Sequence, residues 1–397
     1  MTRLTANWLD YTFAGLLLVV LGGVFVHAPL TIWLGSFWPD QALLIKAWKE
    51  ILLILAVIVG LATLWRHGRW TELRSSWVLL PVVYGTLHLA LLPLFNQSWT
   101  EVVAGLMIDL RYIVYFVLTY LIIRLYPGWR PLFLRVVAIG MMIVGGFGLL
   151  QVLVLPADVL TGIGYGEETI QPYLTVDENP DYVRINSTMR GPNPLGAIAA
   201  IGLTLGASWL VLRSGASRLA RWQRAGLAIG GVGLAIALWA SYSRSAVVAA
   251  IVAVGLVLLL TVGRRLPRAA WIGLFVVGFG ILGGLYAGRD SDFVSNVILH
   301  ENEGTGALVS SNDGHVESLI DGTERLVRQP LGAGIGSTGS ASLLGDEPLI
   351  IENQYLFIAH EVGWIGLGLF TWLFGAVLLA SWRQRRDWRL VITGLGG

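Results

Sequence analysis

The amino-acid sequence predicts an all-α polytopic integral membrane protein with ten complete transmembrane helices. Three observations carry this prediction: the composition, the apolar runs, and the placement of the arginines. Of the 397 residues, 55% are hydrophobic and 13% are charged, and the mean hydropathy is +0.70. Soluble domains carry about 25% charged residues, so the composition argues against a water-soluble enzyme.

Ten apolar runs of the chain are long enough to cross a membrane. A helix needs about 20 mostly apolar residues to cross a hydrocarbon core roughly 30 Å thick. The ten runs lie at residues 12–30, 50–65, 77–95, 102–123, 132–155, 194–212, 223–240, 245–262, 269–287 and 355–381. An eleventh run starts at Leu390 and is too short to cross before residue 397, so we expect a truncated helix there.

Positively charged residues mark every second connection between these runs. Seventeen of the 27 Lys and Arg residues lie there, in groups around Arg66, Arg124, Arg218, Arg264 and Arg386. Because such residues resist translocation across a membrane, the alternation predicts that the N-terminus is cytoplasmic.

Two connections on the opposite side are long, residues 156–193 and 288–353, and together they hold 17 of the 25 acidic residues. We predict that both are extracytoplasmic and that functional residues concentrate in them. Within the second, apolar residues recur at helical spacing between Asp313 and Pro330, which predicts an amphipathic helix over 315–328. The whole chain, 1–397, is interpreted as a single integral membrane domain.

Other patterns exclude or discount several kinds of site. The chain has no cysteine, which excludes thiolate metal sites and cysteine nucleophiles. It has no basic stripe of the kind nucleic acids require, so we expect no nucleic-acid partner. Gly334–Gly339 fits a GxGxxG pattern, but no strand precedes it, and we interpret it as a glycine-rich loop. The Asp290–Asp292 pair is interpreted as an exposed helix end, and no metal or cofactor is expected.

Four arginines outside the cytoplasmic groups are candidates for a functional role: Arg111, Arg184, Arg190 and Arg244. An arginine within a membrane bundle costs on the order of 2.5–3.5 kcal/mol on insertion scales, so it needs a partner or a function. Arg244 is the most informative, because it stands in a tight link with three serines, among them Ser243. Guanidinium and hydroxyl groups suit the recognition of phosphate. The alternative is an interfacial arginine that faces lipid headgroups.

Acidic groups also fall in or beside the apolar runs. Glu352 and Tyr355 are one helical turn apart and are expected to share a face. Glu361 is deeper in the last run and is either a buried structural group, paired with an arginine, or part of a site. Arg111 lies beside Asp109 within the fourth run, where it is either a structural ion pair, a side chain that extends toward the interface, or a functional group.

Three stretches together resemble the O-antigen ligase and Wzy-type O-antigen polymerase superfamily of bacterial membrane glycosyltransferases. They are the segment from Arg184 to Gly196, the Ser243–Ser245 link, and the run from Pro330 to Gly336 that leads to Glu352–Leu356 and Glu361–Gly363. The resemblance covers roughly residues 100–381.

The resemblance implies an enzyme of the bacterial cytoplasmic membrane with an extracytoplasmic active site. It implies a glycan donor linked to undecaprenyl diphosphate, and a glycan or glycolipid acceptor. It further implies that Arg184 and Arg244 bind the diphosphate and stabilise it as the leaving group. Arg190 is placed with them, and Asn193, Ser243, Tyr355, Glu361 and Arg111 are supporting candidates. No metal is required if arginines neutralise this charge.

The proton acceptor is left open between two residues. Ligases of this family typically have a histidine where this chain has Glu352, so Glu352 is one candidate base, His315 is another, and neither is a third possibility. Ligase and polymerase both remain open. The alternative class is a transporter or flippase for polyprenyl-linked glycans, which is expected to place its charges along a central path and often has repeated halves.

Overall fold

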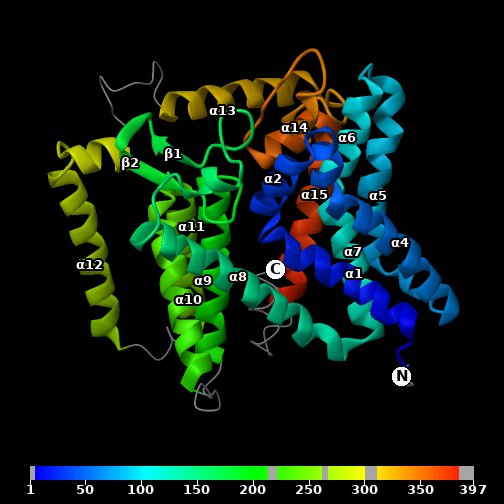
Figure 1. The fold of residues 1–397 in the computed structure, drawn as a ribbon, viewed down its shortest axis with the longest axis horizontal. Helices are drawn as coiled ribbons and strands as arrows, with labels where there is room; N and C mark the ends of the chain where they lie inside the picture. The colour runs from blue at the N-terminus through cyan, green and yellow to red at the C-terminus, as the bar shows by residue number, and fades with distance from the viewer. Residues whose placement is uncertain (1–4, 213–220, 262–266, 300–310, 384–397) are drawn as a thin grey trace. The chain divides into compact units, whose positions relative to one another are not determined.

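The computed structural model describes residues 5–212, 221–261, 267–299 and 311–383. These residues are mostly helical, with a single two-stranded hairpin, and they form two compact units (Figure 1). The first unit comprises residues 1–21, 46–134 and 313–380, and the second comprises 22–45, 135–312 and 381–397. Each unit is described by itself below.

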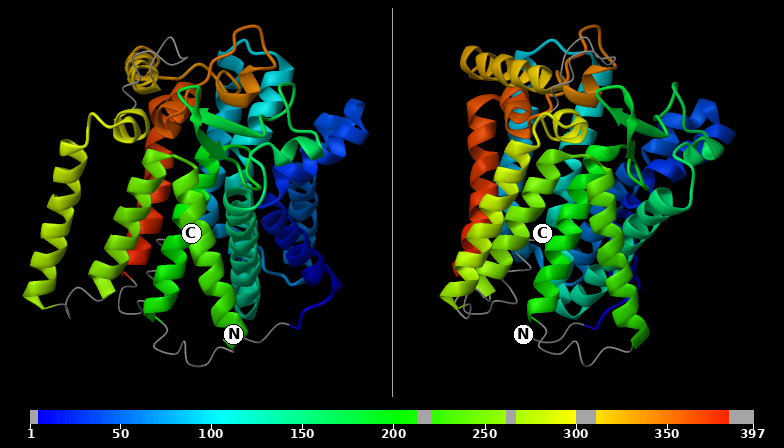
Figure 2. Two further views of the ribbon diagram at one scale, coloured as in Figure 1. Left: turned by 60° about the vertical axis from the view of Figure 1, so that its left-hand side comes forward. Right: turned by 90° about the vertical axis from the view of Figure 1, so that its left-hand side faces the viewer.

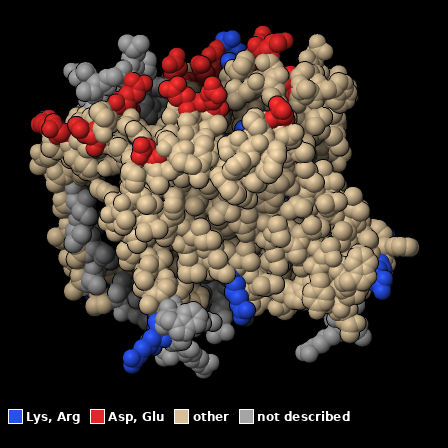
Figure 3. Space-filling view, in the orientation of Figure 1, with Lys and Arg blue, Asp and Glu red and all other residues tan. Residues whose placement is uncertain are grey.

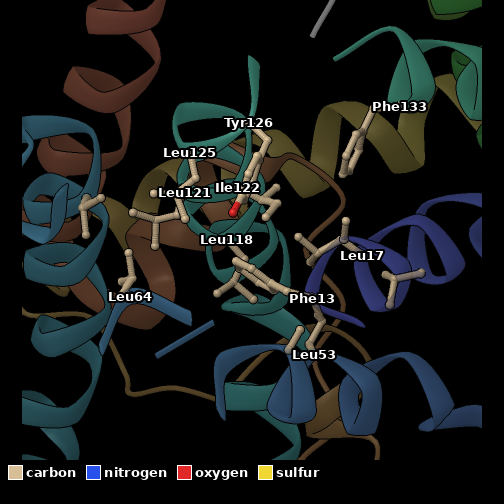
Figure 4. Packing of buried hydrophobic residues seen from close by; sticks show 14 residues of the cluster. Phe13, Leu17, Leu53, Leu64, Leu118, Leu121, Ile122, Leu125, Tyr126 and Phe133 are labelled. Atoms are coloured by element: carbon tan, nitrogen blue, oxygen red, sulfur yellow. The ribbon is translucent and has the colours of Figure 1, made fainter. Parts of the chain in front are cut away.

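The first unit is a helical bundle built from distant parts of the chain. Its helices are α1 (Trp8–Val24), α4 (Trp48–Arg66), α5 (Ser76–Leu91), α6 (Trp99–Asp109), α7 (Arg111–Leu125), α13 (Ser311–Arg328), α14 (Gly339–Ser342) and α15 (Gln354–Arg383). Phe13 and Leu17 of α1 pack on Ile122 of α7 in a fully buried cluster (Figure 4). A Cβ on Gly60 would lie 2.8 Å from the Phe13 ring, so this glycine lets α4 approach α1 closely, as small residues do in membrane bundles.

The second unit contains the remaining long helices and the hairpin. Its helices are α2 (His27–Phe37), α3 (Ala42–Lys46), most of α8 (Arg130–Leu153), α9 (Pro192–Leu212), α10 (Arg221–Ala240), α11 (Arg244–Thr261) and α12 (Arg268–Ala287). Helix α9 packs against both α10 and α11, and the three lie together in Figure 2. A Cβ on Gly233 of α10 would lie 2.5 Å from the Gly145 carbonyl oxygen of α8, so glycine is required at this crossing.

Short irregular helices connect these elements. The 3₁₀ turns are Pro39–Gln41, Trp70–Arg74, Leu92–Leu94, Pro127–Trp129 and Val159–Ile163, and a π-helical turn covers Val294–Leu299.

Seven described helices are long and apolar enough to cross a membrane, or eight if α1 and α2 form one bent span. The seven are Trp48–Arg66, Ser76–Leu94, Trp99–Leu125, Pro127–Leu153, Pro192–Leu210, Arg244–Thr261 and Gln354–Ala380. Two further predicted runs fall in α10 and α12, whose apolar helical stretches are shorter. The described residues therefore confirm a mostly helical membrane protein, but not the count of ten. The predicted eleventh run lies outside the described residues. Most of the surface seen in Figure 3 carries no charged side chain, as expected for contact with lipid.

Three predicted helices are interrupted. The run at 12–30 is not one straight helix, because α1 ends at Val24 and α2 leaves at 89° to it. A glycine pair, Gly22–Gly23, ends α1, and Pro29 has no amide hydrogen with which to continue that helix. Helix α6 gives way to α7 at Leu110, and α15 is kinked at Val362 and Gly363.

The long segments contain more structure than the sequence indicated. Within 156–193, strands β1 (Tyr173–Val176) and β2 (Asn179–Ile185) pair antiparallel, so the all-α prediction is wrong at this point. The two turn residues, Asp177 and Glu178, have φ values of 47° and 62°, the left-handed conformation that matches the twist of a tight hairpin. Helix α13 covers the expected 315–328 and begins at Ser311.

Candidate functional site

Arg184, on β2 of the second unit, is held in place by two acceptors. Its Nε donates a hydrogen bond to the Ser241 carbonyl oxygen (2.9 Å), and its Nη2 donates one to Asn193 Oδ1 (2.6 Å). Both acceptors are uncharged at neutral pH. Burial lowers the pKa of the Arg184 guanidinium, the charge of Asp177 raises it, and the charge of Arg244 lowers it. Because a guanidinium stays protonated in proteins, this half-buried cation is oriented and favours an anion nearby.

Arg244 is the first residue of α11 and contributes the second cation. Its Nη1 donates to the Ile298 carbonyl oxygen (3.0 Å). The link from α10 to α11 is as tight as the sequence predicted, since α10 ends at Ala240. Ser243, predicted to support phosphate binding, is 4% exposed, and its hydroxyl lies 3.5 Å from that of Ser245.

The start of α9 packs tightly against this link. A Cβ on Gly196 would lie 2.8 Å from Ala246 Cβ and 2.9 Å from Ser241 Oγ. The absence of a side chain at Gly196 therefore lets α9 approach the link closely enough for Asn193, one turn earlier, to reach Arg184. The N-termini of α9 and α11 add positive helix-dipole ends to the two guanidinium groups.

The backbone of the link is strained at Tyr242. Its φ is 47°, a left-handed conformation that costs of order 1–3 kcal/mol for a bulky residue and is often found at functional sites. The Tyr242 ring meets Tyr182 edge-on at 6.4 Å, and Tyr182 meets Phe293 at 6.2 Å. Burial raises the pKa of the Tyr242 phenol. Sequence reasoning missed both tyrosines; the only signal was that each lies two residues before an arginine.

Arg190 does not join this group through any hydrogen bond or ion pair among the described residues. Its side chain is exposed, in the turn that precedes α9. Its place beside the other two arginines stays a prediction.

In the first unit, Glu361 is 1% exposed, and its Oε1 accepts a hydrogen bond from the Gly336 amide (2.9 Å). Its charged neighbour is Asp109, whose side chain lies within hydrogen-bonding reach. One of the alternatives for Glu361 was a pairing with an arginine; among the described residues it has instead a carboxyl–carboxyl contact that sequence reasoning missed. Arg111 forms an ion pair, but with Glu50 (Nη1 to Oε1, 2.9 Å), a residue that the sequence had not connected to it.

The residues around Glu352 differ from the expectation in one respect. Helix α15 begins at Gln354, so Glu352 precedes it and does not share a helical face with Tyr355. Asn353 begins the helix instead, because its Oδ1 accepts from the amides of Tyr355 (3.0 Å) and Leu356 (3.2 Å). The side chains of Glu352 and Tyr355 are exposed, and the Tyr355 ring meets Phe370 edge-on at 5.9 Å.

His315 lies in the first half of α13, but its side chain falls outside the described residues. No group of three or more His, Cys, Asp or Glu side chains in the described part of the chain is arranged to hold a metal ion.

A comparison with protein families matches residues 229–371 to the family described as O-antigen ligase. The match contains Arg244, Glu352 and Glu361, and it starts after Arg184. No curated protein sequence matches this chain.

Proposed function

We propose, because residues 229–371 belong to the O-antigen ligase family, that the chain is a membrane glycosyltransferase whose donor is a glycan linked to undecaprenyl diphosphate. It either ligates this glycan to an acceptor or polymerises it. The reaction takes place on the extracytoplasmic side of the bacterial cytoplasmic membrane, with the N-terminus in the cytoplasm.

The observation that carries this proposal is the Arg184–Arg244 pair. Arg184 is oriented by Ser241 and Asn193, and Arg244 by Ile298, all within the second unit. When the glycosidic bond breaks, the diphosphate gains negative charge, and preoriented guanidinium groups stabilise that charge most at the transition state. In this mechanism the two arginines hold the leaving group, and Asn193 positions Arg184.

The acceptor hydroxyl attacks the anomeric carbon and loses its proton to a base. Glu352 is one candidate because its carboxylate is exposed just before α15, His315 is a second, and a base other than these two is the third alternative. A positioned base of this kind contributes roughly 100- to 10,000-fold to the rate. The acceptor is a glycan or glycolipid hydroxyl, and the arginines make a metal unnecessary for leaving-group departure.

A transporter for polyprenyl-linked glycans is the second candidate. The kink of α15 at Gly363, beside the buried carboxyl group of Glu361, favours it, because transporters often build substrate sites from broken helices. The two functions differ in their products: a transporter leaves the glycan–diphosphate bond intact, whereas a transferase breaks it.

The test reconstitutes the full chain in liposomes with a lipid-linked oligosaccharide as donor. A ladder of longer products from the donor alone indicates a polymerase, and product that appears only with an added acceptor indicates a ligase. Arg244→Ala is expected to stop transfer, while Arg289→Ala, an exposed arginine that pairs with Asp290, is the matched control. Wild-type turnover by Arg244→Ala would overturn the proposed site, and movement of intact donor without product would favour the transporter.

A further inference from the structure

Two positions in the first unit, the α6–α7 boundary and the kink of α15, each lie next to a carboxyl group. Helix α6 ends at Asp109, and α7 starts at Arg111. In α15 the last regular residue before the kink is Glu361, after which Val362 (φ −125°, ψ 15°) and Gly363 (φ 64°, ψ −164°) leave the helical conformation. A break in an apolar helix leaves backbone groups that need partners from the protein, since lipid offers none.

The glycine-rich segment 330–336 supplies the partners at the α15 kink. The amide of Ala333 donates to the His360 carbonyl (2.6 Å), and that of Gly334 donates to the Glu361 carbonyl (3.1 Å). In return, the Trp364 amide donates to the Pro330 carbonyl (2.9 Å). A Cβ on Gly363 would lie 2.3 Å from the Pro330 oxygen, so only glycine permits this contact. The segment therefore completes the backbone hydrogen bonding of a broken helix.

The Glu361 side chain fixes the end of the same segment. Its Oε1 accepts from the Gly336 amide, and Gly336 has a φ of +84°. A Cβ on Gly336 would lie 2.4 Å from the Glu101 carbonyl oxygen, and one on Gly105 would lie 2.7 Å from the Gly336 nitrogen. Gly336 is thus held between α6 and α15, with the Glu361 carboxyl as its hydrogen-bond acceptor.

Asp109 faces this carboxyl from α6. The two side chains are within hydrogen-bonding reach of each other, and Asp109 Oδ2 is buried with no hydrogen-bond partner. The phenols of Tyr84 and Tyr112 and the charge of Arg111 also face the pair. A hydrogen bond between two carboxyl groups requires that one of them carry a proton, because two carboxylates have acceptors only.

The balance of charges in the bundle also indicates one proton for the two carboxyl groups. Arg111 pairs with Glu50 (2.9 Å), and Lys49 Nζ lies 3.2 Å from the same Glu50 oxygen. With Asp109 and Glu361, this group has two cations and three carboxyl groups, so one proton makes it neutral. Because uncompensated charge in an apolar bundle is costly, the neutral arrangement is favoured.

We propose that Asp109 and Glu361 share one proton, and that Glu361 in this form is a positioning residue that holds the 330–336 segment on the kink of α15. The segment leads directly into residues 337–352, which end at the candidate base Glu352, so the pair fixes the start of the chain that carries this base. The effect on catalysis rests on the proposed function, whereas the position of the segment does not.

The absence of native cysteine allows a direct measurement of that position. Ile335, beside Gly336, is 2% exposed, whereas Ile350 is 53% exposed. In Ile335→Cys the thiol is expected to resist a maleimide reagent in membranes, and in Ile350→Cys it is expected to react freely. Adding Glu361→Ala removes the acceptor for Gly336 and is expected to speed labelling at position 335 about tenfold, the factor for one lost buried hydrogen bond, with no change at position 350.

Glu361→Gln separates the shared proton from a negative charge. The amide oxygen still accepts from Gly336 and the amide nitrogen donates to Asp109, so protection of position 335 is expected to stay close to wild type. Gly336→Ala is a positive control, because it displaces the segment with both carboxyl groups intact. Equal protection in Glu361→Ala and wild type would overturn the positioning role, and labelling in Glu361→Gln as fast as in Glu361→Ala would overturn the shared proton. Glu361→Gln is nearly isosteric, so if the alanine variant fails to insert, its labelling is compared with that of wild type and of Gly336→Ala, and loss of protection at position 335 would overturn the shared proton.

Discussion

The arginine site of the second unit and the carboxyl pair of the first unit place charge in the protein in opposite ways. Arg184 is held by a carbonyl and an amide oxygen, and it lies close enough to Arg244 for their charges to interact unfavourably. In the first unit, Glu50 forms ion pairs with Arg111 and Lys49, and the Asp109 carboxyl group contacts that of Glu361. Guanidinium groups oriented by uncharged acceptors are typical of a ligand site, whereas charges paired within a bundle stabilise that bundle. The following predictions test this division.

The largest effect is expected at Arg184. Arg184→Ala should lower the rate of glycan transfer roughly 100- to 1000-fold, the range for one lost group that stabilises transition-state charge. Arg184→Lys keeps the charge but cannot donate to Ser241 and Asn193 in the same fork geometry. Its rate of glycan transfer should therefore lie between those of wild type and Arg184→Ala. Single-turnover rates in liposomes measure both. If Arg184→Lys transfers glycan no faster than Arg184→Ala, the orientation of the guanidinium group matters more than its charge. If Arg184→Ala transfers glycan at the wild-type rate, the assignment of a ligand site is wrong.

A smaller loss is expected at Glu352. Glu352→Gln should lower the rate about 100-fold while donor binding stays unchanged, because the side chain takes a proton and does not hold the diphosphate. Binding of lipid-linked donor and single-turnover rate are compared in the same preparation, with Glu347→Gln, another exposed acidic residue of this segment, as the control. Unchanged turnover would remove Glu352 as the base and leave His315 or neither of the two.

Gly363 tests the structural role assigned to the first unit. Gly363→Ala should lower the free energy of unfolding by about 1–3 kcal/mol, since its φ of 64° with ψ of −164° suits glycine alone and a Cβ would meet the Pro330 oxygen. Gly368→Ala in the same helix is the control, because a Cβ there meets nothing within 4 Å. Thermal unfolding in detergent measures the difference, and equal stability of the two variants would contradict the account of the kink.

The smallest effect is expected for the Arg111–Glu50 pair. Arg111→Ala leaves Glu50 buried without this partner and should destabilise the protein by about 1 kcal/mol, because the arginine side chain is 39% exposed and partly screened. Adding Glu50→Gln removes the stranded charge and should restore part of the loss. The readout is the unfolding temperature of the single and double variants. If the change in unfolding temperature of the double variant equals the sum of the two single changes, the ion pair does not couple Arg111 and Glu50.

The sequence predicted those features that depend on local pattern. Apolar runs located the long helices, and periodicity between Asp313 and Pro330 located α13. Charge placement singled out Arg184 and Arg244, and the structure brings both to the α10–α11 link.

Features that depend on distant partners were not predictable. Nothing in the run 355–381 indicates that α15 breaks at Gly363, because the hydrogen bonds that make the break tolerable come from residues 330–334. The Asp109–Glu361 contact has the same cause, since it joins helices far apart in the chain. The β1–β2 hairpin was missed because its turn, Asp177–Glu178, lacks the glycine that usually marks a tight hairpin.

The residues that follow Gly336 form a loop whose two ends are closed against each other. Thr338 Oγ1 donates to the Leu349 carbonyl (3.0 Å) and accepts from the Ile351 amide (3.2 Å), and the Gly339 amide donates to Leu349 (2.8 Å). Between these ends, Ala341 and Ser342 are buried and α14 contacts α6, whereas Leu343 and Leu344 are more than half exposed. Doubling the length of such a loop costs only about 0.6 kcal/mol. Inserted residues are thus expected to be tolerated at Leu343 and Leu344, where they lengthen an exposed turn and leave the buried Ala341 and Ser342 in place.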